Sequence, residues 1–209
     1  MPSEPIRDPK TDRLLTPQNA AFIIIDYQPI QISSIRSMDP QEMVFNLVSS
    51  AKAALNYDVP IVHSTVNVQT GANKPPIAEL QELLGHLPTY DRTAINSWED
   101  VEFKKAVEAT GRKKLIMTAL WTEACLAFPA LDALKEGYEV YVVADAVGGT
   151  SLTAHEAALR RIEQAGGTLI SKTQLWCELQ RDWARTDTVP GFMYVFQNAD
   201  GSNPEKDAE

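Results

Sequence analysis

The feature of the sequence that most constrains its fold is an alternation between short apolar runs and segments with helical spacing. The first run, 21–25, is rich in β-branched residues and ends at Asp26, as expected for a strand buried on both faces. Further strands are expected at 60–66, 90–94, 113–120, 138–144 and 168–171. Strands that alternate with helices form right-handed crossovers on a parallel sheet. The sequence therefore predicts a three-layer α/β/α sandwich with a mainly parallel six-stranded sheet, order 3-2-1-4-5-6.

Capping residues mark several of the expected helices. Residues 39–42 (DPQE) combine an N-cap aspartate, a first-turn proline and a capping-box acid, and they predict a helix from residue 40. Thr122 is expected to cap a helix that stops at Gly137, and Thr153 with Glu156 to open the next. The remaining helices are expected at 76–84, at 98–109 and around 175–183.

The length and composition fit one domain rather than two. A chain of 209 residues is close to the usual size of a single domain, and 44% of its residues are hydrophobic, which is sufficient for a packed core. The alternating pattern occupies residues 19–196, which we assign to a single α/β domain. Residues 1–18 are expected to form an N-terminal arm that lies on a neighbouring subunit, and 197–209 a disordered acidic tail.

Charge and motif content exclude several classes of protein. The net charge of -9, with no cluster of Lys and Arg, argues against nucleic acid as a partner. Apolar runs such as 115–121 are far shorter than the ~20 residues that cross a bilayer, so we expect no membrane partner and a cytoplasmic protein. The three histidines lack metal-ligand spacing and no glycine-rich phosphate motif is present, so neither a metal nor a cofactor is expected.

Three reactive side chains are expected to meet at one edge of the sheet. Ligands of open parallel sheets bind beyond the carboxyl ends of the strands, where the strand order reverses. Asp26 ends the first strand, Arg92 lies near the third, and Cys125 begins the helix after the fourth. With Thr122 as the N-cap, Cys125 would lie in the first turn, where free N–H groups stabilise a thiolate. Pro129 would kink this helix.

Each of these assignments has a plainer alternative. A free cysteine is usually a small buried apolar residue, and an aspartate after a strand often caps a loop. The position of Cys125 at a helix start near Asp26 favours chemistry over packing. Cys177, between Trp176 and Leu179 in the last expected helix, is interpreted as structural.

Three segments resemble the isochorismatase-like cysteine hydrolases, and most closely their YcaC-like branch. They are 23–28 (IIIDYQ), 119–131 (ALWTEACLAFPAL) and 140–150 (VYVVADAVGGT), and the similarity extends from about residue 19 to 183. The resemblance implies a triad of Asp, Lys and Cys, in which Asp26 and Cys125 match and Arg92 stands where the family has lysine. Arginine can hold an anion but does not readily release a proton.

The resemblance has further implications for the backbone and the assembly. It implies a cis peptide between Leu120 and Trp121, an oxyanion hole formed by the N–H groups of Trp121 and Cys125, and a homo-oligomer, with an octamer as one candidate. The Trp121 indole is larger than the residue usual there and is expected to reshape the pocket. Four other side chains are expected either to bind substrate or simply to pack: Gln28, Asn96, Trp98 and Phe128.

The expected function is hydrolysis of a small amide-like or other C–N substrate through a covalent thioester on Cys125. One alternative is a non-catalytic binding or scaffold protein that retains the fold, with Arg92 in place of the family lysine. Another is a redox sensor, against which counts the lack of a resolving cysteine near Cys125. Fast, Asp26-dependent labelling of Cys125 by an electrophile would distinguish the enzyme from the scaffold.

Overall fold

The computed structural model describes residues 8–197, with side chains to residue 194. Its centre is a six-stranded sheet in the order β3-β2-β1-β4-β5-β6, in which every strand pair is parallel. The predicted fold class and strand order are therefore confirmed. The strands are β1 (Ala20–Ile25), β2 (Ile61–Val66), β3 (Thr89–Arg92), β4 (Lys114–Ala119), β5 (Glu139–Val143) and β6 (Thr168–Ile170).

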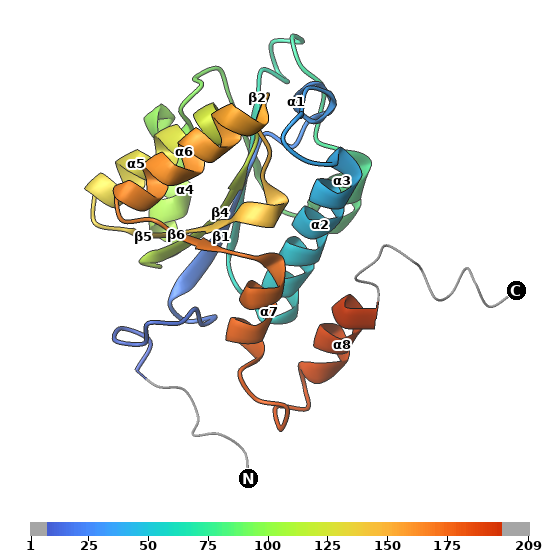
Figure 1. Ribbon diagram of the computed structural model, residues 1–209, viewed down its shortest axis with the longest axis vertical. Helices are drawn as coiled ribbons and strands as arrows, with labels where there is room; N and C mark the ends of the chain where they lie inside the picture. The colour runs from blue at the N-terminus through green and yellow to red at the C-terminus, as the bar shows by residue number, and fades with distance from the viewer. Residues whose placement is uncertain (1–7, 198–209) are drawn as a thin grey trace, which may run out of the picture.

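Helices cover both faces of the sheet (Figure 1). One layer holds α2 (Pro40–Asn56), α3 (Ala78–Leu84), α7 (Lys172–Gln180) and α8 (Val189–Gln197). The other holds α4 (Val101–Ala109), α5 (Ala127–Lys135) and α6 (Leu152–Gln164). The short α1 (Pro29–Ser33) follows β1, and 3₁₀ turns occupy Ser97–Glu99 and Ala144–Ala146.

The continuous apolar run of β1 is explained by these two layers. Phe22 and Ile24 belong to the core beneath α2, whereas Ile23 and Ile25 belong to the core beneath α4 and α5. Successive side chains of a strand point to opposite faces, so a strand covered on both sides must be apolar at every position. Each of these four side chains is fully buried, which stabilises the fold by roughly 1.5–3 kcal/mol apiece.

The helix caps agree with prediction in one case and differ in another. Asp39 caps α2 as expected, because its side chain accepts hydrogen bonds from the backbone N–H groups of residues 41 and 42. The prediction that Thr153 opens α6 is wrong. Ser151 is the cap, since its hydroxyl accepts from the Ala154 N–H at 3.1 Å, and Thr153 already lies inside the first turn.

The C-terminal region departs most from the sequence prediction. The expected last helix stops at Gln180 instead of reaching Trp183, and a further helix, α8, follows. Trp183 contacts Phe192 of α8 edge to face, with ring centroids 5.0 Å apart. The interpretation of Cys177 as a buried residue is also wrong, because α7 buries Leu175, Trp176 and Leu179 and leaves Cys177 exposed.

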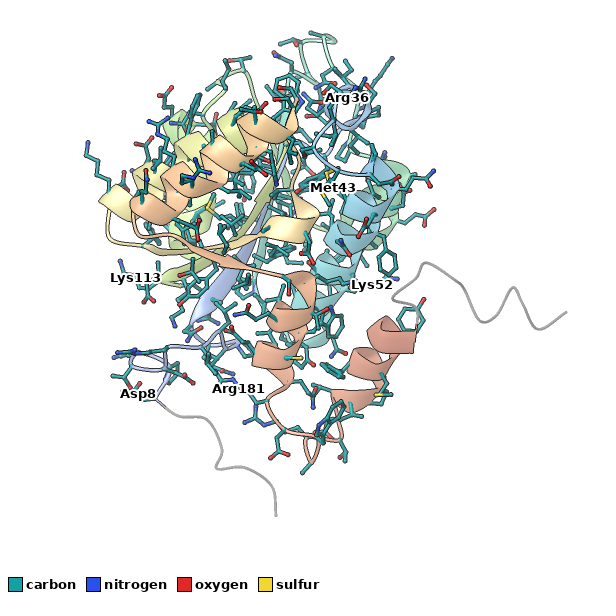
Figure 2. All side chains as sticks on the ribbon, in the orientation of Figure 1. Asp8, Arg36, Met43, Lys52, Lys113 and Arg181 are labelled. Carbon is teal, nitrogen blue, oxygen red and sulfur yellow. The ribbon has the colours of Figure 1, made fainter. Side chains whose placement is uncertain are left out.

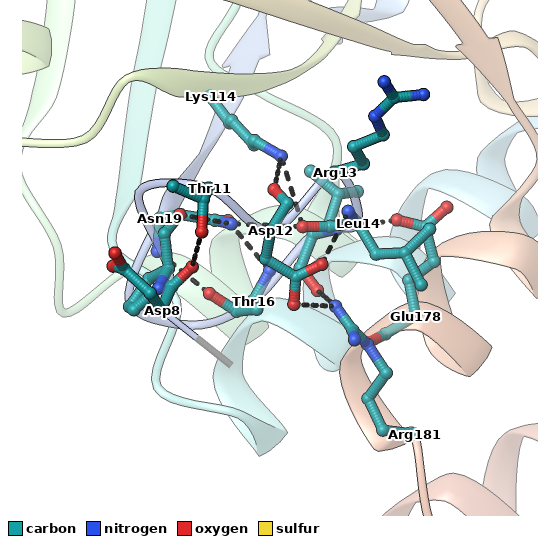
Figure 3. Close-up of polar contacts among 12 residues, drawn as sticks. Asp8, Thr11, Asp12, Arg13, Leu14, Thr16, Asn19, Lys114, Glu178 and Arg181 are labelled. Atoms are coloured by element: carbon teal, nitrogen blue, oxygen red, sulfur yellow. Dashed lines mark hydrogen bonds and ion pairs between the residues drawn. The ribbon is translucent and has the colours of Figure 1, made fainter. Parts of the chain in front are cut away.

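The described part of the N-terminal arm, residues 8–18, packs on its own subunit (Figure 3). Lys114 Nζ donates to the Asp12 carbonyl at 2.6 Å, and Arg181 Nη2 donates to the Asp12 carboxylate at 3.0 Å. The Leu15 N–H donates to Glu178 at 2.7 Å. These contacts hold the arm at the amino end of the sheet. Residues 1–7 and 198–209, which include nearly all of the expected acidic tail, lie outside the described residues.

The two ends of the sheet carry different features. Figure 2 places Arg36 at the carboxyl end of the strands and Arg181 at the opposite end. A cavity of about 970 Å³ lies at the Arg181 end, lined by residues of the arm and of the α7–α8 connection, and it holds none of the three expected reactive residues. None of the helices within residues 8–197 has the length and apolar character needed to cross a membrane.

Candidate active site

Asp26 is fixed at the carboxyl end of β1 by an unusual backbone conformation. Its φ angle is 62°, in the left-handed region that aspartate and asparagine tolerate better than most residues. The Asp26 N–H donates to the carbonyl of Ser64 at 3.0 Å, and the Asp26 carbonyl accepts from the Gln28 N–H at 2.8 Å. The side chain is fully buried. The chain therefore turns sharply at the end of the strand and leaves the carboxylate inside the crevice.

Arg92, the last residue of β3, reaches across β2 to grip this carboxylate. Its Nη1 lies 2.7 Å from Asp26 Oδ1, its Nη2 lies 2.7 Å from Oδ2, and both side chains are 0% exposed. This bidentate geometry suits the planar guanidinium and is not available to a lysine amine. Further donations go to the Ser64 hydroxyl at 3.0 Å, the Thr65 carbonyl at 3.0 Å and the Ile95 carbonyl at 3.1 Å. The guanidinium is thereby fixed in place.

Cys125 lies beside the same carboxylate, close enough for its thiol and Asp26 to interact through charge and hydrogen bonding. The crevice thus brings together all three residues expected from the sequence. The surroundings of the sulfur oppose the resting thiolate expected from the sequence. Burial, and then the adjacent Asp26 carboxylate, raise the pKa of the Cys125 thiol from its usual 9.0 to about 12, although Arg92 opposes this. Burial also raises the pKa of Asp26, and the contact with Arg92 opposes that shift.

The segment that carries Cys125 is a single π-helical turn, Thr122–Leu126, which we name the Cys125 turn. Trp121 is its N-cap, and the Leu126 N–H donates to the Trp121 carbonyl at 3.1 Å, one residue wider than an α-helical bond. The expected cap at Thr122 is wrong, because its hydroxyl instead pairs with His155 Nδ1 at 2.8 Å. Cys125 thus lies in a wide turn that precedes α5, rather than in the first turn of a regular α-helix.

Proline explains where the wide turn ends. Pro129 has no N–H to offer the Cys125 carbonyl, so α-helical bonding cannot extend unbroken from α5 back through Cys125. The irregularity expected at Pro129 is therefore found one turn earlier, in the Cys125 turn, and the regular α5 starts at Ala127. Single π-turns of this kind occur frequently at functional sites.

The peptide bond between Leu120 and Trp121 is cis, as the resemblance implied. The backbone of Trp121 acts on the Cys125 thiol and lowers its pKa, against the larger effect of burial. The Trp121 indole is not loose in the crevice, since its Nε1 donates to the Ser34 hydroxyl at 2.6 Å. This contact ties the start of the Cys125 turn to the segment that follows α1.

The comparisons with known proteins agree with this geometry. The family model described as the isochorismatase domain matches residues 20–174. The chain belongs to the isochorismatase family. It is 36% identical over 185 residues to the probable hydrolase YcaC of Escherichia coli K12, covering 88% of each protein.

Solved structures place this isochorismatase-family chain near the same relatives. YcaC from Pseudomonas aeruginosa, determined with hexane-2,5-diol and covalent acrylamide, superposes with a TM-score of 0.80 and 33% identity over 92% of this chain and 99% of that one. Escherichia coli YcaC, an octameric hydrolase of unknown specificity, gives a TM-score of 0.80 with 32% identity over 91% of this chain and 98% of that one. Bacillus subtilis nicotinamidase, with a TM-score of 0.61, 16% identity and coverage of 73% and 100%, shares the fold.

Among the four residues expected either to bind substrate or to pack, three have their polar or aromatic groups engaged within the protein. The Gln28 amide accepts from the Val66 N–H and donates to two carbonyls, those of Val66 at 3.1 Å and Lys74 at 2.6 Å. Asn96 caps the 3₁₀ turn and donates to Asp132 at 2.7 Å, while Trp98 is buried edge-on against Tyr138. These contacts favour packing. Phe128, 37% exposed, keeps a free aromatic surface.

Sequence reasoning overlooked the residues that support Arg92. Ser64 and Thr65 lie near the carboxyl end of β2, and the Ser64 hydroxyl and the Thr65 carbonyl both accept from the guanidinium. The serine in this strand is a signal that could have been used. Within residues 8–197 no group of three His, Cys, Asp or Glu side chains is arranged to hold a metal ion. His63, buried and 3% exposed, has no hydrogen-bond partner for its Nε2.

Proposed function

We propose that the chain is a cysteine hydrolase that cleaves a small amide or another C–N substrate through a covalent thioester on Cys125. The observation that carries this proposal is a buried cluster in which Arg92 holds both oxygens of the Asp26 carboxylate and the Cys125 thiol interacts with that carboxylate. A nucleophile, a base and a group that orients the base are the parts that covalent catalysis needs.

The resting protonation state follows from burial and charge. With a pKa of about 12, Cys125 is a thiol at neutral pH, and Asp26, gripped by two guanidinium N–H groups, is the carboxylate that accepts its hydrogen bond. Attack by sulfur therefore has to be coupled to transfer of the thiol proton to Asp26. The raised pKa of Asp26 suits this role, since a base works best when its pKa approaches the working pH.

The reaction then proceeds in two halves. The Cys125 sulfur attacks the substrate carbonyl carbon as its proton moves to Asp26, and the oxyanion that forms is bound by the N–H groups of Trp121 and Cys125. The C–N bond breaks as Asp26 returns the proton to the leaving amine, which leaves a thioester. Water attacks the thioester and gives a proton to Asp26. The C–S bond breaks, the acid departs, and the proton returns to sulfur.

Arg92 acts in this scheme by holding charge. A guanidinium stays protonated throughout, so it cannot shuttle the proton. It keeps the Asp26 carboxylate ionised in a buried site and fixes its orientation toward the thiol. Arginine therefore supplies the orienting half of the role that the family assigns to lysine.

A screen of small amides and nitriles against the wild type and Cys125→Ala tests the proposal. Hydrolysis by the wild type and its loss in Cys125→Ala is the expected result, and turnover that survives the substitution would exclude Cys125 as the nucleophile. Acrylamide, which is bound covalently in the Pseudomonas aeruginosa YcaC structure, gives a second test. The exposed Cys177 serves as an ordinary thiol in the same molecule, and peptide mass spectrometry reports both labelling rates.

The labelling ratio separates an enzyme from a scaffold. A catalytic Cys125 is expected to react faster than Cys177 despite its burial, because Asp26 accepts its proton during attack. A scaffold that only retains the fold predicts the reverse order, since a buried thiol of high pKa is inert.

We also infer a homo-oligomer for this chain, with an octamer as the expected state, supported by the octameric Escherichia coli YcaC. Native mass spectrometry at micromolar concentration tests this directly. A monomer under those conditions would contradict it.

A further inference from the structure

We propose that Glu123 is a positioning residue, one that fixes the Cys125 turn by gripping the loop before α6; the inference rests on the proposed role of Cys125. Glu123 lies inside that turn, two residues before the sulfur. Its Oε1 accepts two hydrogen bonds from Thr150, from the backbone N–H at 3.0 Å and from the hydroxyl at 2.6 Å. One carboxylate oxygen thus joins the turn to residue 150.

The loop that Glu123 grips is itself fixed on its other side. The Gly149 N–H donates to the Ser37 hydroxyl at 3.0 Å, and the Gly149 carbonyl accepts from the Arg36 N–H at 3.0 Å. The Gly148 carbonyl accepts from the Thr122 N–H at 2.9 Å. The loop is therefore held in place by hydrogen bonds to the segment after α1. The contact with Glu123 fixes the Cys125 turn relative to this loop.

The fit between Glu123 and this loop depends on a missing side chain. A Cβ on Gly149 would lie 2.7 Å from Glu123 Oε2 and 3.0 Å from the Cβ of His155. Real Cβ atoms essentially never approach another atom to 2.7 Å, so any other residue at 149 would displace the Glu123 carboxylate and would be crowded by His155. The second glycine of the VGGT segment therefore leaves the space that the Glu123 carboxylate occupies.

Stability alone does not account for Glu123. Its Oε2 is buried and has no hydrogen-bond partner, and a buried polar atom without a partner costs free energy. A glutamate held at that cost beside a reactive cysteine is explained if the geometry it imposes serves the reaction. A π-helical turn has few bonds of its own to define its shape, and a displacement of ~1 Å at a reacting atom can slow a reaction about 100-fold.

Two substitutions separate positioning from general weakening of the fold. Glu123→Ala removes both bonds to Thr150, whereas Glu123→Gln keeps an acceptor oxygen for Thr150, removes the charge and replaces the other oxygen with an NH2 group. We expect Glu123→Ala to slow acrylamide labelling of Cys125 by at least about 10-fold while Cys177 in the same molecule is unaffected. Glu123→Gln is expected to stay within about threefold of the wild-type rate, since rescue needs only the acceptor oxygen.

A second pair of variants tests the inference if Glu123→Ala does not fold. Thr150→Val removes one of the two donors and is expected to slow labelling by an intermediate amount, and Thr150→Ser keeps both donors and serves as its control. Unchanged or faster labelling of Cys125 in folded Glu123→Ala overturns the inference. Labelling of Glu123→Gln as slow as that of Glu123→Ala overturns its hydrogen-bond basis.

These results can be told apart from a failure of the proposed function. If wild-type Cys125 labels no faster than Cys177, the proposed nucleophile is wrong. If wild-type labelling is fast and Glu123→Ala is equally fast, the nucleophile stands and only the positioning role of Glu123 is lost.

Discussion

Replacement of Asp26 by asparagine separates two accounts of how Cys125 becomes reactive. If Asp26 is the base that receives the thiol proton, Asp26→Asn must slow the attack of sulfur on an electrophile. If instead a resting thiolate attacks, the same substitution must accelerate it, because the Asp26 charge raises the pKa of the thiol and its loss would free more thiolate. The two accounts therefore predict changes of opposite sign.

The expected change in labelling rate follows from the pKa of the Cys125 thiol. A pKa of about 12 in place of 9.0 reduces the thiolate population at neutral pH by about 1000-fold, so attack through a pre-formed thiolate would be slow. General-base catalysis typically contributes about 100-fold to 10,000-fold. We therefore expect Asp26→Asn to slow labelling of Cys125 by at least about 100-fold, with no change at Cys177.

Asparagine is the appropriate replacement at this position. Like aspartate, it tolerates the left-handed conformation of residue 26, so the φ angle of 62° adds little strain. The substitution leaves the Arg92 charge buried without its partner, which is expected to destabilise the fold by about 3–5 kcal/mol. Unfolding in urea should be measured first, and labelling performed where the variant is folded.

The assay is competitive acrylamide labelling, with the Cys125 to Cys177 ratio read by peptide mass spectrometry. Ser64→Ala is the matched control, because it removes one hydrogen bond from Arg92 and leaves the contact between Asp26 and the thiol untouched. A higher ratio in folded Asp26→Asn than in the wild type would refute the base mechanism.

Substitutions at three further positions test the residues that support the site and the buried histidine. Arg92→Met leaves the Asp26 carboxylate buried without a cationic partner and should lower the free energy of unfolding in urea by about 3–5 kcal/mol. Arg92→Lys keeps the charge and should cause a smaller loss. Burial lowers the pKa of His63 to about 4, so the unfolded chain takes up a proton before the folded one. Wild-type stability should therefore be full above pH 6.5 and fall by up to about 3 kcal/mol towards pH 4, a loss that His63→Leu should lack in urea titrations at each pH. Gln28→Ala should cost about 2–3 kcal/mol and speed amide exchange after β2, since the Val66 and Lys74 backbone groups lose their partners.

The fold and the meeting of three residues could be predicted because both depend on simple geometry. A strand such as β1 must be apolar on both faces if helices cover both, and the carboxyl ends of parallel strands share one edge. Asp26 and Cys125 follow neighbouring strands and meet for that reason. The longer reach of Arg92 across β2 also depends on oxygens of Ser64 and Thr65 that accept from its guanidinium, which sequence position alone does not reveal.

The protonation state and the exact helix geometry could not be predicted, because they depend on what surrounds each atom. The helix-start position of Cys125 suggested a low pKa, but the pKa is governed by the burial of the sulfur and by the carboxylate beside it. The amides of Gln28 and Asn96 were candidates for substrate binding because the sequence does not reveal their hydrogen-bond partners, which belong to distant segments. The apolar sequence of α8 contains Pro190 and Gly191 and therefore gave no helix signal. The helix packs through an aromatic contact with Trp176.

The role of Arg92 and the high pKa of Cys125 both follow from the same arrangement of side chains around Asp26. Both terminal nitrogens of the guanidinium are directed to Asp26, Ser64 and backbone carbonyls, so the cation screens the carboxylate more than the sulfur. The thiol thus has an anion as its hydrogen-bond partner and keeps its proton at rest. Because Asp26 is held in place and its own pKa is raised, it can accept that proton when sulfur attacks and release it to the leaving group. An arginine that never titrates is compatible with hydrolysis for this reason: a single mobile proton, shared by Cys125 and Asp26, is sufficient for both halves of the reaction.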